Sequence, residues 1–183
     1  MDKRALFTVL AGLCLTALSV SMPPTAAGSP VGKEMPGFSI ASGKEETLTD
    51  RMVRGHVLVL FYESKETTEK NRELKKFLNA FYSSQSREVQ RIVFRLPVIN
   101  CKSAVWPITG VWKSSLRKHT KKEGYTIYGD WDGRMAINYG FRQDDTNLMI
   151  IDKKGIIRFF KSGFIDQSQY NGIRKLLTEL VEQ

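Results

Sequence analysis

Val57-Leu58-Val59-Leu60-Phe61-Tyr62 (VLVLFY) is a continuous apolar run of six residues near the first third of the chain. Its length and its β-branched and aromatic content are typical of a strand rather than a helix. A strand without polar alternation is buried on both faces, which happens in parallel or mixed sheets that helices cover. The run therefore predicts a central strand of a layered α/β domain.

An amphipathic helix is expected directly after this strand. Its apolar stripe follows the helical spacing i, i+3, i+4 and i+7: Leu74, Phe77, Leu78 and Phe81. Glu66 and Glu69 are expected in or near its first turn, where carboxylates favour the positive end of the helix dipole. Lys75 and Lys76 are expected further along its polar side.

Further strands are predicted on both sides of this unit. Residues 38–40 alternate as a short first strand, and residues 92–99 (IVFRLPVI) read as a second long strand. Pro97 cannot donate to a ladder, so it indicates a strand end, an edge or a bulge. Residues 127–128 are expected to form a short strand, and 131–139 a loop or one helical turn.

The last third of the chain predicts a hairpin and a closing helix. Residues 148–151 and 156–160 are the two strands, and Gly155 between them can adopt a positive φ. An apolar stripe from Tyr170 to Leu180 then predicts a helix, with Asp166 or Ser168 as its cap. The full order is that of a thioredoxin-like α/β fold, with a central mixed β-sheet flanked by helices on both faces.

The N-terminal segment has the pattern of a secretory signal peptide. Lys3 and Arg4 precede an uncharged, mostly apolar run over residues 5–20, and Thr25-Ala26-Ala27 supplies small residues for cleavage. The expected organisation is a cleavable signal peptide over residues 1–27, with a second cleavage choice near residues 19–21, and one thioredoxin-like domain over residues 28–183. The run is short for a transmembrane anchor, so we expect a periplasmic protein that is not an integral membrane protein.

The cysteine and histidine content limits the chemistry. Cys14 lies inside the apolar run, in a context unlike a lipobox, and would leave with the signal peptide. Cys101 would then be the single thiol, unable to form an internal disulfide. His56 and His119 lack ligand spacing, so neither a metal nor a cofactor is expected.

The fold predicts a reactive site after the central strand, but the usual residues are missing. Aligned with a C-x-x-C redox motif, Glu66 and Glu69 take the two cysteine places. Aligned with a peroxiredoxin P-x-x-x-T-x-x-C pattern, Glu63 replaces the proline, Thr67 matches the threonine, and Lys70 replaces the cysteine. Neither alignment leaves a thiol where a helix N-terminus would activate it.

The second landmark of redoxins is a cis-proline before the strand that ends in Ile-Asp. Thr146 occupies that place, and a cis peptide is costly without proline. Acid–base chemistry by carboxylates or hydroxyls near the old site is an alternative. The remnant redoxin-site positions are Glu66, Thr67, Thr68, Glu69, Lys70 and Thr146.

A basic helix is predicted from Val111 to about Lys122, in a chain of net charge +9. Its polar side carries Lys113, Arg117, Lys118, Lys121 and Lys122. These residues could contact an anionic lipid surface, or they are simply a solvated face. Export and the lack of helix-turn-helix spacing make nucleic acid an unlikely partner. Trp106, Trp112 and Trp131 could line a groove nearby or serve as core residues.

An ordered set of segments resembles the YtfJ family of small exported proteins, over about residues 33–182. The matching segments are 64–74 (SKETTEKNREL), 98–100, 111–116 (VWKSSL), 151–155 (IDKKG), 161–163 and the Leu-rich last helix. The resemblance implies a degenerate thioredoxin-like fold, similar to periplasmic redoxins, without a settled activity or catalytic residues to carry over. The family has carried the label of transcriptional regulator, which the predicted export disfavours.

These observations predict an exported, non-catalytic binding or accessory module without thiol redox activity. Its partner would be an unknown envelope protein or a small ligand. Two alternatives remain: an enzyme of non-thiol chemistry at the remnant site, and a single-thiol protein that acts through Cys101.

Overall fold

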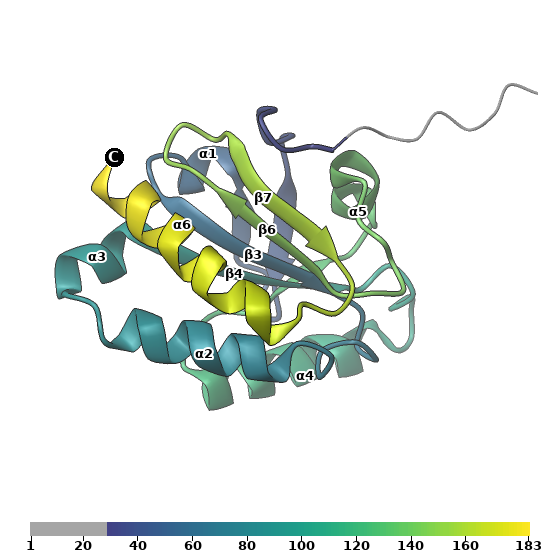
Figure 1. Cartoon of the computed structure of the whole chain (residues 1–183). Coiled ribbons are helices and arrows are strands. Elements are labelled where there is room, and N and C mark those ends of the chain that lie inside the picture. The colour runs from purple at the N-terminus through teal and green to yellow at the C-terminus, as the bar shows by residue number, and fades with distance from the viewer. Residues whose placement is uncertain (1–28) are drawn as a thin grey trace, which may run out of the picture.

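The computed structural model describes residues 29–183 (Figure 1). The predicted signal peptide, with Cys14, lies outside the described residues. Among the helices of residues 29–183, none has the length and apolar character needed to cross a membrane.

The strands of the described chain form one mixed sheet in the order β2-β1-β5-β4-β3-β6-β7. Central strand β3 pairs in parallel with β4 and antiparallel with β6, so that Leu60 lies between Leu96 and Met149. Every residue of β3 is buried, as its apolar run predicts. The strands are β1 (Ser39–Ser42), β2 (Thr47–Thr49), β3 (Val57–Glu63), β4 (Val93–Asn100), β5 (Tyr128–Asp130), β6 (Asn147–Ile151) and β7 (Ile157–Ser162).

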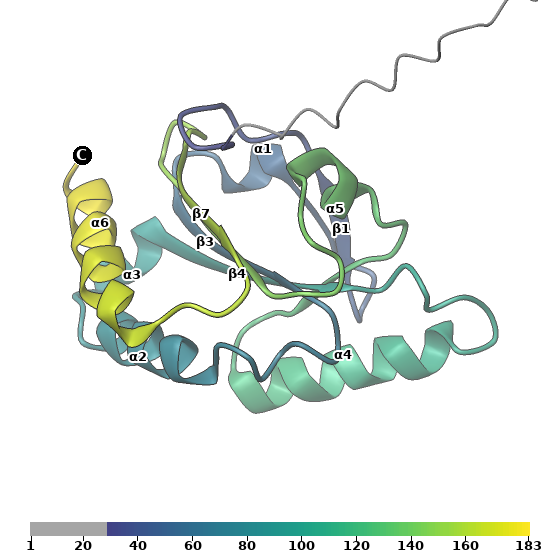
Figure 2. The same cartoon turned by 45° about the vertical axis from the view of Figure 1, so that its right-hand side comes forward.

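Helices cover both faces of this sheet, as predicted (Figure 2). Helices α1 and α5 lie on one face, and α2, α4 and α6 lie on the other. The helices are α1 (Asp50–Val53), α2 (Arg72–Ser83), α3 (Arg87–Ile92), α4 (Thr109–Glu123), α5 (Arg134–Tyr139) and α6 (Tyr170–Glu182), with a 3₁₀ turn, η1, at Gln167–Gln169.

The strand alternation divides the core between these layers. Leu58, Leu60 and Tyr62 of β3 pack in the cluster that includes α1 and α5 side chains. Val59 and Phe61 point the other way, into the cluster under α2 and α6. A third, smaller cluster around Cys101, Ala104 and Leu116 lies under α4 and is separate from the second. The helical layer on that face is therefore in two parts.

Several local predictions are confirmed. Gly155 turns the β6–β7 hairpin at φ +85°. The predicted cap of the last helix is displaced, because the Asp166 side chain accepts from the Ser168 backbone N–H and caps the 3₁₀ turn η1, whereas the N-cap of α6 is Gln169. Pro97 lies opposite Phe61 in the parallel ladder, but β5 pairs with β4 only from Val98 onward. The missing N–H of Pro97 thus falls where one side of β4 has no neighbouring strand.

Other local predictions are wrong. Helix α2 begins at Arg72, so Glu66 and Glu69 precede it and are not in its first turn, which carries Glu73. Residues 87–92 are helical, with Ser86 as the cap, so β4 begins at Val93 and not at Ile92 as predicted. The loop before α2 is a series of turns (residues 65–71). Polar side chains that bond their own backbone favour turns over a helical start, and Thr67 does this with Ser64.

Candidate functional site

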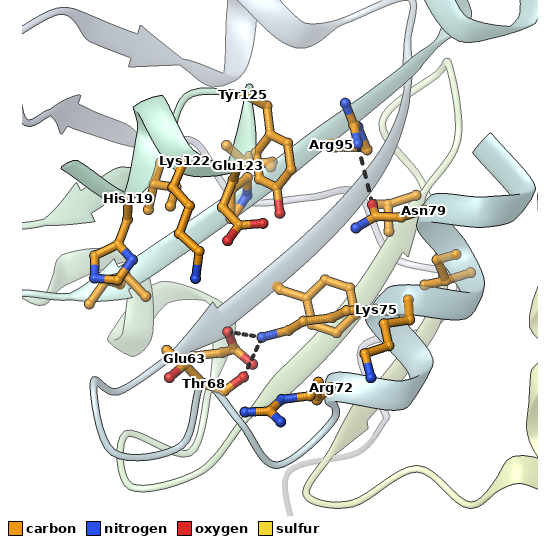
Figure 3. Close-up of a pocket in the computed structure, with 18 of the residues that line it drawn as sticks. Glu63, Thr68, Arg72, Lys75, Asn79, Arg95, His119, Lys122, Glu123 and Tyr125 are labelled. Atoms are coloured by element: carbon orange, nitrogen blue, oxygen red, sulfur yellow. Dashed lines mark hydrogen bonds and ion pairs between the residues drawn. The ribbon is translucent and has the colours of Figure 1, made fainter. Parts of the chain in front are cut away.

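The last residue of the central strand is a buried glutamate. Glu63 follows Val59 and Phe61 on the helix-covered face of β3 and is only 3% exposed. Its Oε2 lies 2.6 Å from the Lys75 ammonium (Figure 3). Its Oε1 accepts a 2.8 Å hydrogen bond from the Thr146 hydroxyl. Burial raises the pKa of Glu63, while Lys75 and Thr146 oppose that rise. Both carboxylate oxygens are therefore already engaged within the protein.

Asn71 extends this arrangement across the fold. Its buried amide nitrogen donates to the Gly163 carbonyl at 3.0 Å and reaches the Thr146 hydroxyl at 3.5 Å. Its oxygen accepts from the Ile165 backbone N–H at 3.0 Å. One side chain thus joins the start of α2 to the loop before β6 and to the loop after β7.

Asp145 is a second buried carboxylate, next to Thr146 in the chain. The Lys70 ammonium lies 2.6 Å from its Oδ1, which also accepts from the Thr146 backbone N–H at 2.9 Å. Burial opposes ionisation, but Lys70, this backbone bond and Arg142 together lower the pKa of Asp145. We call these residues the redox-end network: Glu63, Lys70, Asn71, Lys75, Asp145 and Thr146.

The redox-end network occupies the place where the fold predicts the reactive site, and its polar groups pair with one another. Buried charges that are paired and hydrogen-bonded are stable in place, and breaking one pair is costly. Such a closed set braces the chain segments that meet there, and it offers a visiting molecule few free donors or acceptors.

The structure brings together only some of the predicted remnant-site residues. Lys70 and Thr146 belong to the redox-end network, and the Thr68 carbonyl accepts from Lys75 at 2.7 Å. The Thr67 hydroxyl bonds within its own turn, to the backbone of Ser64. Glu66 is exposed, and Glu69 pairs with Arg72 on the surface. Glu66 and Glu69 are therefore not a buried carboxylate pair that could divide acid and base roles.

Sequence reasoning missed Glu63, Asn71, Lys75 and Asp145 as parts of one site. The available signal was the period of two along β3, which places Glu63 on the same face as Val59 and Phe61. A carboxylate continuing a buried face needs a partner. Lys75 supplies it from α2, so its assignment to the polar side of that helix is wrong.

Cys101 lies after β4, in the small cluster under α4, and is 1% exposed. Burial, together with the nearby Asp130 carboxylate, raises the pKa of its thiol to about 12. A β-carbon on Gly129 would lie 3.0 Å from its sulfur, so backbone packs tightly against it. The nucleophilic thiolate form is therefore suppressed at neutral pH.

A cleft opens beside the redox-end network, between α2 and α4 and above the outward face of β4 (Figure 3). Its volume is about 780 Å³, within the range of small-molecule sites. Phe61, Pro97 and Ile99 contribute from the strands, and Phe81 and Trp112 from the helices. We call this cavity the α2–α4 cleft. It lies between the two separate core clusters of that face.

The predicted basic residues of α4 have different surroundings, and their contact with an anionic surface stays a prediction. Lys113 pairs with Glu45, and Arg117 donates to the Gly43 carbonyl at 2.8 Å, which ties both to the β1–β2 turn. Lys118 and Lys121 are exposed, whereas Lys122 lines the α2–α4 cleft. Positions 113 and 117 are one turn apart, but 118 and 122 lie well around the helix from them.

The histidines and tryptophans that the sequence analysis considered lie at separate places in the fold. His56 is held edge-on to Phe94, 6.0 Å between ring centroids, and His119 lines the cleft. Residues 29–183 contain no group of three or more His, Cys, Asp or Glu side chains placed to hold a metal ion. Of the three tryptophans, Trp112 lines the cleft, Trp131 packs in the small cluster, and Trp106 is 87% exposed.

The strand order and the two helical layers define a thioredoxin-like fold, and solved structures agree. Similar structures include a candidate thiol:disulfide interchange protein (DsbE) of Chlorobium tepidum, with TM-score 0.62 and 13% identity over 82% of this chain and 97% of that one. The exposed lipoprotein thioredoxin of Streptococcus pneumoniae matches with TM-score 0.57 and 17% identity, over 79% and 100%. A thiol peroxidase of Chromobacterium violaceum matches with TM-score 0.59 and 14% identity, over 84% and 88%. No family model and no curated protein matches the sequence.

Proposed function

We propose that this chain is an exported, non-catalytic protein of the thioredoxin fold, of the YtfJ type, that binds a ligand without thiol redox chemistry. The observation that carries the proposal is the redox-end network, in which Glu63, Asn71 and Thr146 engage one another where a redoxin holds its reactive groups. The predicted signal sequence supports an extracytoplasmic, periplasmic location.

The α2–α4 cleft supplies the binding surface of this proposal. It borders the redox-end network, because Glu63 and Lys75 of the network also line the cleft. Thr68, whose carbonyl accepts from Lys75, belongs to the cleft lining as well. Concave sites with apolar walls and a few polar groups are where small molecules bind. A fold can keep its architecture and take a new role at such a site.

The two alternatives have less support. Non-thiol catalysis would use Glu63, whose pKa burial raises, but both of its oxygens are occupied by Lys75 and Thr146. A single-thiol mechanism would need Cys101 to reach a substrate, and that side chain is buried with a raised pKa.

We therefore expect the mature protein to reduce no insulin disulfides and to consume no peroxide with thiol reductants above the buffer rate. Cys101→Ser should match wild type in both assays, and the Cys101 thiol should react with a chromogenic disulfide reagent only after denaturant is added. Turnover in either assay would overturn the non-redox proposal. Turnover that disappears in Cys101→Ser would assign it to the single thiol.

A further inference from the structure

We propose, building on the proposed binding function, that the α2–α4 cleft takes an amphipathic anion, a molecule with a long apolar body and one carboxylate or phosphate headgroup. Free fatty acids and single-chain phospholipids share this chemistry. The inference follows from the walls of the cleft, from one uncompensated cation on its floor, and from the charges at its rim.

The floor of the cleft is a strip of β4 that lies between α2 and α4. On β4, Arg95, Pro97 and Ile99 lie half-buried on the cleft side, whereas Leu96 and Val98 are fully buried on the other face. Phe81 from α2 and Trp112 from α4 border this strip. An apolar body in the cleft would remove this apolar surface from water, which favours binding.

Arg95 is the cation on the floor. Its guanidinium lies between two aromatic rings, 4.1 Å from the centroid of Tyr82 and 4.6 Å from that of Tyr125. Asn79 accepts its hydrogen bond at 3.3 Å, and within the described residues no carboxylate comes within ion-pair distance (Figure 3). Cation–π contacts offset part of the desolvation cost of such a cation. An anionic headgroup would supply the charge that is missing.

The rim of the cleft carries more positive than negative charge. Glu63 and Glu69 neutralise Lys75 and Arg72, and Glu73 from outside the cleft neutralises Lys76. Lys122 forms no ion pair with any described residue. Lys65 also lines the cleft and forms no ion pair with any described residue. The cationic lining side chains are Lys65, Arg72, Lys75, Lys76, Arg95 and Lys122, and the carboxylates are Glu63, Glu69 and Glu123. An anion is therefore favoured over a neutral or cationic amphiphile.

The test is calorimetric titration of the mature protein with single-chain probes below their micelle-forming concentrations. The probes are laurate, dodecyl phosphate, dodecanol and dodecyltrimethylammonium, which share one chain and differ in headgroup. Laurate and dodecyl phosphate should each bind with one site per chain, at least about tenfold more tightly than dodecanol, and the cation should not bind. The better of the two anions indicates whether a fatty acid or a phospholipid is the natural source.

Two variants locate the charge contact. Arg95→Met should weaken laurate binding about tenfold while dodecanol binding stays the same, and Lys122→Gln, on the exposed rim, should weaken it less. Lys121→Gln is the matched control, because Lys121 is the adjacent exposed lysine of α4 and does not line the cleft. It should bind like wild type.

The anionic-headgroup inference would be overturned if all four probes bound equally well. It would also be overturned if Lys121→Gln weakened laurate binding as much as Lys122→Gln. In either case the cleft would still bind a ligand, but without selecting an anionic headgroup. Failure of every probe to bind would overturn it as well. The proposed function is judged separately by the insulin and peroxide assays, which involve no amphiphile.

Discussion

Asn71→Ala is expected to lower the free energy of unfolding by about 3 kcal/mol, because it leaves buried polar groups without partners. The Ile165 N–H and the Gly163 carbonyl both lose their bond to this side chain, and Thr146 loses a contact. A loss of this size is a large share of the total stability of a small domain. Urea unfolding, followed by circular dichroism, measures it.

Two controls separate the network from its surroundings. Asn138→Ala removes the same group from an exposed position on α5, and Glu66→Gln/Glu69→Gln changes two exposed carboxylates of the adjacent turns. The free energy of unfolding of both variants should stay within about 0.5 kcal/mol of the wild-type value. A similar stability for Asn71→Ala and Asn138→Ala would show that the redox-end network is not a structural brace.

Ser115→Trp is expected to remove most ligand binding while the fold stays intact. Ser115 is an exposed residue of α4 that lines the α2–α4 cleft, so an indole there fills space instead of replacing a core side chain. With anilinonaphthalene sulfonate as the probe, an apolar ring system that carries one negative charge, the affinity should fall at least about tenfold. Fluorescence titration measures it.

Ser114→Trp is the matched control for this variant. Ser114 is the neighbouring exposed serine of the same helix and does not line the cleft. It should bind the probe like wild type, with a similar midpoint of unfolding. Equal probe binding by Ser115→Trp and Ser114→Trp would place the binding surface elsewhere on the protein.

The elements that the sequence predicts well are those whose signal is local. The apolar run of β3, the stripe of Leu74 and Leu78 on α2, and the hairpin turn at Gly155 each need only a short window of residues. Element ends are less predictable, because the Thr67 and Thr68 hydroxyls donate to backbone carbonyls three residues earlier, which favours turns, and α2 starts only at Arg72.

The site was less predictable because its contacts are distant in the chain. Glu63 and Thr146 are 83 residues apart, and Asn71 and Ile165 are 94 apart. Matching known redox motifs did locate the segment after β3 and the position of Thr146. It could not show that Lys75 turns inward, or that a strip of β4 lies between α2 and α4, since both depend on how the helices pack.

Native mass spectrometry of the protein, isolated from the cells that express it, tests the central claim most directly. The claim is that the thioredoxin fold here holds a ligand in the α2–α4 cleft and performs no thiol chemistry. Wild type should carry a non-covalent adduct of defined mass that Ser115→Trp lacks, and Cys101 should be a free thiol in both. A wild-type protein without adduct, or one with a covalent modification on Cys101, would contradict the account.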